Sequence, residues 1–411
     1  MRKLRRIVLV SLLTLLMSFL ALVTFILHES KDEVNATFEN VETQLQSFYN
    51  EKRLGGFAVA VFDADSVFFS KGFGYSDLKQ RIPYTTQTQQ YVASIAKTTI
   101  GIALLKAQEQ GLLALDDPIN KYLPFEVKHP KFPELPITIR QLATHTAALD
   151  YNEVVVESLY ISDSLKNSSL APFMMDYFGS DTVTYSNYAP GSDWNYSNIG
   201  ASLAAYIIEL QSGKSFADFT QEYIFDPLGM KQTAWFEKNT APSLRTKYYE
   251  VGDQEIEPVA TSGVQLYPSR DLITNAVDLT NYCQAIIARD ELLLSATSFK
   301  ELLRPQLNNS VSHQSVDNHA IFFMIDRNQY GITYQMIGMN GGDNCINTMM
   351  WFDPVTQLGY IFIGNTGASS LNRVHHIWIY RTLVSLGDHI MFSKSWKYRW
   401  HNVKSRLTAM L

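Results

Sequence analysis

The sequence is poor in cysteine. Its 411 residues include only Cys283 and Cys345, too few for the disulfide framework that holds small secreted domains together. One bridge between them and two free thiols are both open alternatives at this point. No Cys/His cluster has the spacing of a zinc site, and we expect neither a metal nor a cofactor.

The sequence also lacks an excess of positive charge. It has 34 Lys and Arg against 40 Asp and Glu, a formal net charge of −6, and no basic stripe that would favour a nucleic-acid partner. A glycine-rich phosphate loop and internal repeats are absent as well. The length permits a large core, in one two-part domain or in two ordinary domains.

Long hydrophobic runs are absent except at the amino terminus. Residues 1–6 are basic, and residues 7–27 then follow without a charge. Twenty-one helical residues at about 1.5 Å each match a hydrocarbon core of about 30 Å. A signal peptide is the rival interpretation, but its apolar region is usually only about 7–15 residues. We expect a single-pass anchor at 7–27, a cytoplasmic segment at 1–6, a linker at 28–39 and the remainder outside the cytoplasm.

Ser94 and Lys97 are the most informative pair in the chain. They are three residues apart at the start of a helix-like segment with an apolar stripe, which Gly111 is expected to end. That spacing brings two side chains onto one helix face. A serine hydroxyl needs a base to become a nucleophile, and a buried lysine with a lowered pKa can be that base. The alternative is that Ser94 is a simple N-cap.

Each short motif occurs twice in the sequence. Residues 76–79 repeat the Ser-x-x-Lys pattern, but their surroundings predict a loop. Residues 185–187 and 196–198 both read Tyr-Ser-Asn, and only the second leads into an apolar helical segment. We therefore predict that Tyr196 and Asn198 belong to the site, because tyrosine can carry a proton beside a lysine and asparagine can hold a polar network.

These motifs and several further segments, in this order, resemble the serine β-lactamase-related family, which includes class C β-lactamases, D-Ala-D-Ala carboxypeptidases and related esterases. The resemblance covers residues 40–386 and rests on residues 56–61, 72–74, 92–97, 115–119, 137–149, 196–198 and 224–230. It implies an α/β (α+β) fold in which an antiparallel sheet is flanked by N- and C-terminal helices, with an inserted, mainly helical subdomain at about 94–250. The resemblance also implies that the segment around His145 is a structural turn after a helix.

The resemblance also implies roles for individual residues. Ser94 attacks a carbonyl, and Lys97 with Tyr196 moves the proton. Asn198 orients the lysine and the substrate. The backbone N–H groups of Ser94 and Gly342 form the oxyanion hole, which needs no side chain.

The chain departs from the family at its third motif. The pattern is Lys or His, a small residue and Gly, whereas this sequence reads Met339-Asn340-Gly341. We expect these three residues to border the substrate. Because methionine replaces a cationic or imidazole group, recognition of a substrate carboxylate, and with it of β-lactams and D-Ala-D-Ala, should be weak.

The remaining elements follow from apolar runs and turn residues. A hairpin is predicted at 56–62 and 67–72, later strands at 321–325, 334–339, 346–352 and 359–364, and a closing helix at 371–386. The first and last strands should share one antiparallel sheet. The tail at 387–411 mixes basic and aromatic residues, which suits either a membrane surface or a solvated helical extension.

The sequence therefore predicts a membrane-anchored, extracytoplasmic serine hydrolase. Its substrate would be a small-molecule or peptide ester or amide, with a cell-wall peptide as one candidate. Two alternatives stay open, an acyltransferase or transpeptidase on the same scaffold and a non-catalytic binding protein.

Overall fold

The structure is a computed structural model that describes residue 17 and residues 38–50, 54–150, 160–161, 169–180, 183–252, 256–260, 263–308, 317–327, 332, 334–369 and 372–394. The predicted anchor at 7–27, apart from Met17, lies outside these residues, as do the segment 1–6 and the tail beyond residue 394. Among the helices that the structure describes, none is both long enough and apolar enough to span a bilayer.

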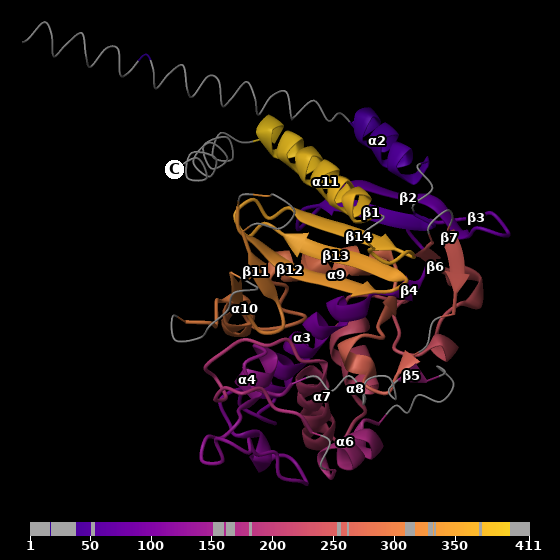
Figure 1. Cartoon of the computed structure of the whole chain (residues 1–411). Coiled ribbons are helices and arrows are strands. Elements are labelled where there is room, and N and C mark those ends of the chain that lie inside the picture. Colours follow the sequence, from indigo (N-terminus) through magenta and orange to yellow (C-terminus); the bar gives the residue numbers. More distant parts are fainter. Residues whose placement is uncertain are drawn as a thin grey trace, which may run out of the picture.

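A sheet of eight antiparallel strands forms the centre of the molecule (Figure 1). Its order is β10-β11-β12-β13-β14-β1-β2-β3. The strands are β1 (Gly56–Phe62), β2 (Val67–Asp77), β3 (Ile82–Pro83), β10 (Asn318–His319), β11 (Met324–Asp326), β12 (Met336–Asp343), β13 (Ile346–Phe352) and β14 (Gly359–Gly364).

In the middle of this sheet the first strand of the described chain, β1, pairs with the last, β14. Strand β14 pairs with β1 on one side, with Phe57 opposite Gly364, and with β13 on the other. Every residue of β1, β13 and β14 is buried. Both faces of these strands are covered, which explains why their sequences are largely apolar, with Asn347 and Thr348 as polar exceptions in β13. The predicted pairing of first and last strands is confirmed.

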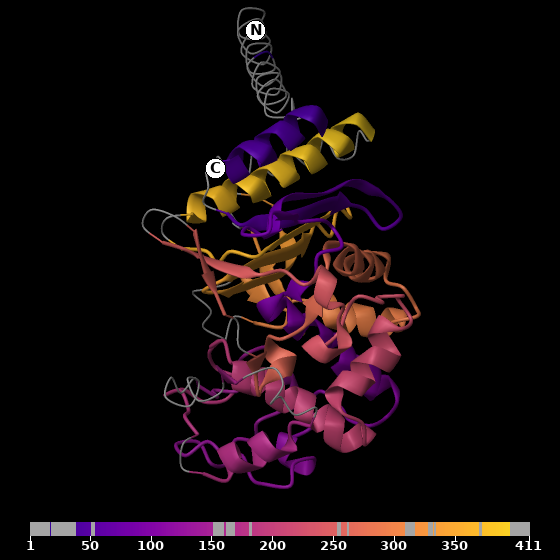
Figure 2. The same ribbon diagram turned by 90° about the vertical axis from the view of Figure 1, so that its right-hand side faces the viewer.

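The terminal helices cover one face of the sheet. Helices α2 (Phe38–Asn50) and α11 (Arg373–Lys394) lie side by side above it (Figures 1 and 2). Trp351, Tyr360 and Phe362 pack beneath them in one hydrophobic cluster. Helix α11 ends at Lys394, so it continues eight residues beyond the predicted boundary at 386 and includes the start of the predicted tail.

The other face of the sheet carries the larger core and the helical part of the chain (Figure 2). The helices on this side are α3 (Ala96–Glu109), α4 (Ile139–Ala143), α6 (Ala171–Phe178), α7 (Asn198–Ser212), α8 (Phe216–Thr220), α9 (Ala276–Ala288) and α10 (Ala296–Leu303). Three two-stranded ribbons pair β4 (Gln90–Tyr91) with β9 (Ile273–Thr274), β5 (Tyr160–Ile161) with β8 (Gly263–Val264), and β6 (Tyr248–Val251) with β7 (Ile256–Val259). The predicted fold class is confirmed.

Three local expectations need correction. Ser76 lies near the end of β2 instead of in a loop. Strand β11 begins at Met324, because Phe322 has φ +56° and interrupts the extended backbone predicted from residue 321. Both cysteines are free and buried, so the alternative of a bridge between Cys283 and Cys345 is wrong.

Candidate active site

Ser94 lies at a sharp change of backbone direction between two elements. The short helix η1 (Ala93–Ile95) follows β4 closely and leads straight into α3. Ala93 has φ +48°, a left-handed conformation that costs a non-glycine residue on the order of 1–3 kcal/mol and that clusters at functional sites. Neither η1 nor α3 has a side-chain N-cap hydrogen bond, so the N-cap interpretation of Ser94 is wrong.

Three predicted side chains meet at the Ser94 hydroxyl. The Tyr196 hydroxyl donates a hydrogen bond of 2.6 Å to Ser94 Oγ, and Lys97 Nζ donates one of 3.1 Å. Ser94 and Lys97 come from η1 and the first turn of α3, whereas Tyr196 comes from the loop before α7, 102 residues away from Ser94. The fold therefore places a nucleophile and two proton-carrying groups within direct reach of one another.

Lys97 has an environment that favours the neutral amine. Its side chain is 0 % exposed, and no carboxylate of the described residues forms an ion pair with it. Burial lowers the pKa of Lys97 well below its usual value, and the charge of Arg270 lowers it further. The Tyr196 ring, 4.8 Å from Nζ, acts in the opposite sense as a cation–π partner. Burial should prevail, because it can shift a pKa by about 3–5 units, whereas a cation–π contact contributes about 0.5–2 kcal/mol.

Tyr196 has an environment that keeps its hydroxyl protonated. Burial raises the pKa of Tyr196, and its hydrogen bond to Ser94 offsets only part of this effect. A phenol with a raised pKa stays protonated, so it can take up a proton only while it gives up its own. Lys97 is therefore the better base, and Tyr196 is suited to be a relay between Ser94, Lys97 and a leaving group.

The second tyrosine motif lies elsewhere. Tyr185 forms an isolated bridge with Leu149, and its ring contacts His129 with the centroids 5.1 Å apart. Burial raises the pKa of Tyr185 to about 12. None of its described contacts is with Ser94 or Lys97, so the fold distinguishes the two copies of the motif.

Sequence reasoning missed two residues that act on Lys97. Lys97 Nζ donates a hydrogen bond of 2.6 Å to the carbonyl oxygen of Ser269, in the short helix η7 (Tyr267–Ser269). The next residue, Arg270, forms an ion pair with Asp343 at the end of β12 and lies 3.7 Å from Asp271. No local motif marks either residue, because Ser269 is 172 positions away from Lys97 along the chain.

Gly341 is the residue of the third motif that approaches the nucleophile. A Cβ at this position would come within 2.2 Å of the Val92 carbonyl oxygen and 3.1 Å of the Ser94 nitrogen. Only glycine allows β12 to pass so close to η1. At Gly342 an added Cβ would meet only the Ile346 carbonyl, at 3.9 Å. The oxyanion role of the Ser94 and Gly342 N–H groups stays a prediction.

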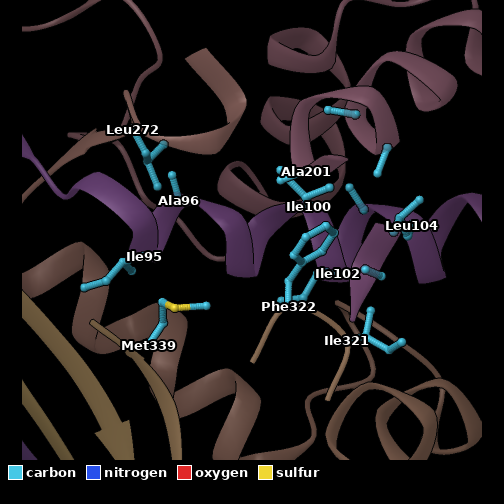
Figure 3. Close-up of a cluster of buried hydrophobic side chains, with 14 of the residues drawn as sticks. Ile95, Ala96, Ile100, Ile102, Leu104, Ala201, Leu272, Ile321, Phe322 and Met339 are labelled. Atoms are coloured by element: carbon cyan, nitrogen blue, oxygen red, sulfur yellow. The ribbon is translucent and has the colours of Figure 1, made fainter. Parts of the chain in front are cut away.

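The side chains of Met339 and Asn340 pack in other surroundings than the Ser94 hydroxyl, and a contact of either residue with a substrate stays a prediction. Met339 is 1 % exposed and packs in the large core beside Ile95 (Figure 3). The Asn340 side-chain oxygen accepts a hydrogen bond of 2.7 Å from Trp351 Nε1, on the face of the sheet that α11 covers. Successive strand residues point to opposite faces, so Met339 lies beneath the site and Asn340 points away from it.

Asn198 is the first residue of α7 and is partly exposed. Its side chain makes no hydrogen bond with Lys97 or Ser94 within the described part of the chain, so the lysine is oriented by Ser269 instead. A substrate contact of Asn198 stays a prediction. In the described segments, no group of His, Cys, Asp and Glu gathers that could hold a metal ion.

Comparison with known proteins agrees with this geometry. The family described as Beta-lactamase matches residues 38–380. The protein PbpX of Bacillus subtilis (strain 168) is 27 % identical over 303 residues, which are 71 % of this chain and 71 % of that protein. The chain spans a smaller part, 45 % and 62 %, of two further curated relatives.

Solved structures show the same fold at low identity. The D-amino acid amidase of Ochrobactrum anthropi SV3 superposes with a TM-score of 0.69 at 21 % identity, covering 87 % of this chain and 100 % of that one. EstCE1, described as a hydrolase with promiscuous acyltransferase activity, superposes with a TM-score of 0.68 at 19 % identity, covering 86 % and 99 %. At these identities the likeness concerns the fold alone.

Proposed function

The chain belongs to the β-lactamase family of serine hydrolases, and we propose that it hydrolyses an ester or amide through a covalent acyl-enzyme on Ser94. One observation carries this proposal. Ser94 Oγ accepts hydrogen bonds from both the Tyr196 hydroxyl and Lys97 Nζ, and the lysine is buried without a carboxylate partner among the described residues. A structural lysine would be expected to have a counter-ion at such a depth.

The reaction would run in two halves. Ser94 Oγ attacks the carbonyl carbon while its proton passes to Lys97, directly or through Tyr196. The negative oxygen of the tetrahedral intermediate is expected to bind the backbone N–H groups of Ser94 and Gly342. As the intermediate collapses, the proton goes to the leaving alcohol or amine. Water then attacks the acyl-enzyme and gives a proton to Lys97, which returns it, directly or through Tyr196, to Ser94 Oγ as the acid is released.

The acyl group of the substrate is expected to be uncharged near the reacting carbonyl. The third motif supplies no cation, because Met339 stands there and is buried in the core, and the guanidinium of Arg270 is engaged by Asp343. A substrate carboxylate would have to compete with that ion pair, which argues against efficient β-lactam recognition. A D-amino acid amidase and a hydrolase with promiscuous acyltransferase activity share this fold, which supports acyl transfer as the reaction class. A cell-wall peptide stays one candidate for the natural substrate.

Labelling with a serine-reactive fluorophosphonate tests the enzymatic proposal. Full-length protein purified in detergent should gain the mass of one adduct, and peptide mapping should place that adduct on Ser94. The non-catalytic alternative predicts no adduct on the folded protein. Its sequence support is the missing cation at the third motif, where Met339 is buried in the core.

The acyl acceptor is a separate question. An acyltransferase or transpeptidase would use the same acyl-enzyme and replace water by an amine or alcohol. EstCE1, with its described acyltransferase activity, keeps this alternative open. Hydrolysis in the presence of increasing glycine or glycerol should leave the acid as main product. A transfer product that dominates at millimolar acceptor would assign the protein to the second class.

We also propose that residues 7–27 anchor the protein in a membrane with the enzymatic part outside the cytoplasm. The support is the uncharged run of 21 residues behind a basic segment. After carbonate washing, full-length protein should stay in the membrane pellet, and protease added from outside should degrade the catalytic part. A shorter, soluble form that begins after residue 27 would indicate a cleaved signal peptide.

A further inference from the structure

His145 is a buried histidine in contact with Tyr196, and the proposed mechanism gives it no role. It follows α4 and is 1 % exposed. Its φ of +58° is a left-handed conformation that few non-glycine residues adopt, although histidine adopts it more often than most. Its imidazole packs against the Tyr196 ring, with the ring centroids 4.5 Å apart and the planes inclined by 35°. A turn residue chosen only for its backbone would not require this contact.

Two atoms of His145 accept hydrogen bonds from backbone N–H groups on either side of Tyr196. The N–H of Asn195 donates a hydrogen bond of 2.8 Å to the His145 carbonyl oxygen. The N–H of Ser197 donates one of 3.1 Å to His145 Nδ1. Ser197 in turn is the N-cap of α7, where its hydroxyl accepts from the N–H of Gly200. The backbone of His145 therefore fixes the residue before the tyrosine, and its imidazole fixes the residue after it and the tyrosine ring; only the imidazole contacts depend on the histidine side chain.

These hydrogen bonds also define the charge of the imidazole. Because Nδ1 accepts from a backbone N–H, the proton of the ring lies on Nε2 and the ring is neutral. Burial lowers the pKa of His145 well below its usual value, and the nearby His319 and Lys97 lower it further. His319 packs edge-on against His145 with the centroids 5.1 Å apart, and burial lowers the pKa of His319 to about 4. A neutral histidine adds no positive charge beside Lys97.

We propose that His145 is a positioning residue that holds the Tyr196 hydroxyl at Ser94 Oγ. The proposal rests on the proposed role of Tyr196 as proton carrier and adds the element that makes its geometry stable. The hydroxyl is at the end of a long side chain, so a small rotation of the 195–197 backbone moves it far from its 2.6 Å contact. A displacement of about 1 Å can cost about 10²-fold in rate.

A double-mutant cycle tests this role. The variants are His145→Ala, Tyr196→Phe and the combination, each measured as the second-order rate constant of fluorophosphonate labelling and as kcat for a nitrophenyl ester. In the native background His145→Ala should lower the rate by about 10–100-fold, in keeping with a displaced catalytic group. In the Tyr196→Phe background, His145→Ala should lower the rate by less than about threefold, because no hydroxyl is left to position. Equal factors in the two backgrounds would overturn the proposal.

Conservative replacements keep the test decisive if His145→Ala folds poorly. Asparagine tolerates a left-handed backbone and places an amide oxygen near the position of Nδ1, so His145→Asn should keep more of the rate than His145→Gln, whose amide reaches the position of Nε2. If the labelling rates of these variants change only in proportion to their melting temperatures, His145 is a structural residue and not a positioning residue. If Tyr196→Phe itself had no effect, the proposed function would fail, which is a different outcome.

His129 provides a matched control. It is also 1 % exposed, and its Nδ1 accepts from the N–H of Lys131 at 3.1 Å. Its ring contacts Tyr185 edge-on with the centroids 5.1 Å apart, whereas the His145 ring is tilted against Tyr196. His129→Ala therefore removes a comparable histidine from the second tyrosine motif. It should lower the melting temperature and leave the labelling rate of the folded protein within about twofold, since Tyr185 is not near Ser94. A loss as large as that of His145→Ala would show that general loosening of the helical part explains both.

Discussion

Replacement of Tyr196 by phenylalanine is the sharpest perturbation that the site allows. The change removes one oxygen atom and keeps the ring, which packs against His145 at 4.5 Å and against Trp194 at 6.4 Å. Ser94 Oγ keeps its hydrogen bond from Lys97, so no buried polar atom loses its last partner. We therefore expect the variant to fold, with a stability loss of about 0.5–1.5 kcal/mol for one hydrogen bond.

The expected loss of activity is much larger than the loss of stability. Removal of a group that transfers a proton in the transition state typically costs about 10²–10⁴-fold in rate. At 1.36 kcal/mol for each factor of ten, this corresponds to about 2.7–5.4 kcal/mol of transition-state stabilisation. The Tyr196 hydroxyl donates a hydrogen bond to Ser94 Oγ, and Lys97 Nζ lies 4.8 Å from the Tyr196 ring centroid, so we expect this hydroxyl to take part in the proposed proton transfer. The loss should appear in kcat, with KM nearly unchanged.

The assay is hydrolysis of a short-chain nitrophenyl ester, with intact-mass labelling as an independent measure. Tyr185→Phe is the matched control, because it removes the same atom from the other copy of the motif. It should keep the native rate within about twofold, as a change away from the site. The reasoning fails if Tyr196→Phe retains more than about a tenth of native kcat, or if the two variants lose activity to the same extent.

Three further predictions follow from the same geometry. Ser94→Ala should abolish fluorophosphonate labelling while Ser76→Ala should not; an adduct that survives Ser94→Ala would contradict the assignment. Arg270→Gln should raise the pKa of Lys97, because the guanidinium disfavours the ammonium. Since the neutral amine is the active form, the acidic limb of the pH–kcat profile should move to higher pH, and an unchanged limb would refute this coupling. The native protein should hydrolyse nitrophenyl esters faster than nitrocefin. Met339→Lys should lower the melting temperature and should not improve nitrocefin turnover, because the new ammonium would be buried in the core. A stable Met339→Lys variant with improved turnover would restore the sequence-based role of Met339.

Much of the sheet was predictable because its strands are fully covered. Residues 56–62, 346–352 and 359–364 are mostly apolar runs between turn residues, and the structure has strands with these bounds. Errors occur where the signal is weak. The predicted closing helix ends at residue 386, whereas α11 continues to Lys394. The sequence does not mark this boundary, because a stretch of mixed basic and aromatic residues suits a helix as well as a tail. Helix propensity alone does not mark such a boundary.

The sequence by itself determined the chemistry that is present: a serine and a lysine at helical spacing, a tyrosine that leads into a helix, and a glycine at the third motif. Only the tertiary structure decided which atoms meet. The contacts of Ser94 with Tyr196 and of Lys97 with Ser269 span 102 and 172 residues, and no local pattern encodes a contact at such separations. The same is true of β12, where pairing with β13 and packing against η1 decide that Gly341 approaches Ser94 and Met339 lies in the core. A strand's residues alternate between two faces, and a shift of one position would exchange them, so the roles of these residues follow from the register of the sheet.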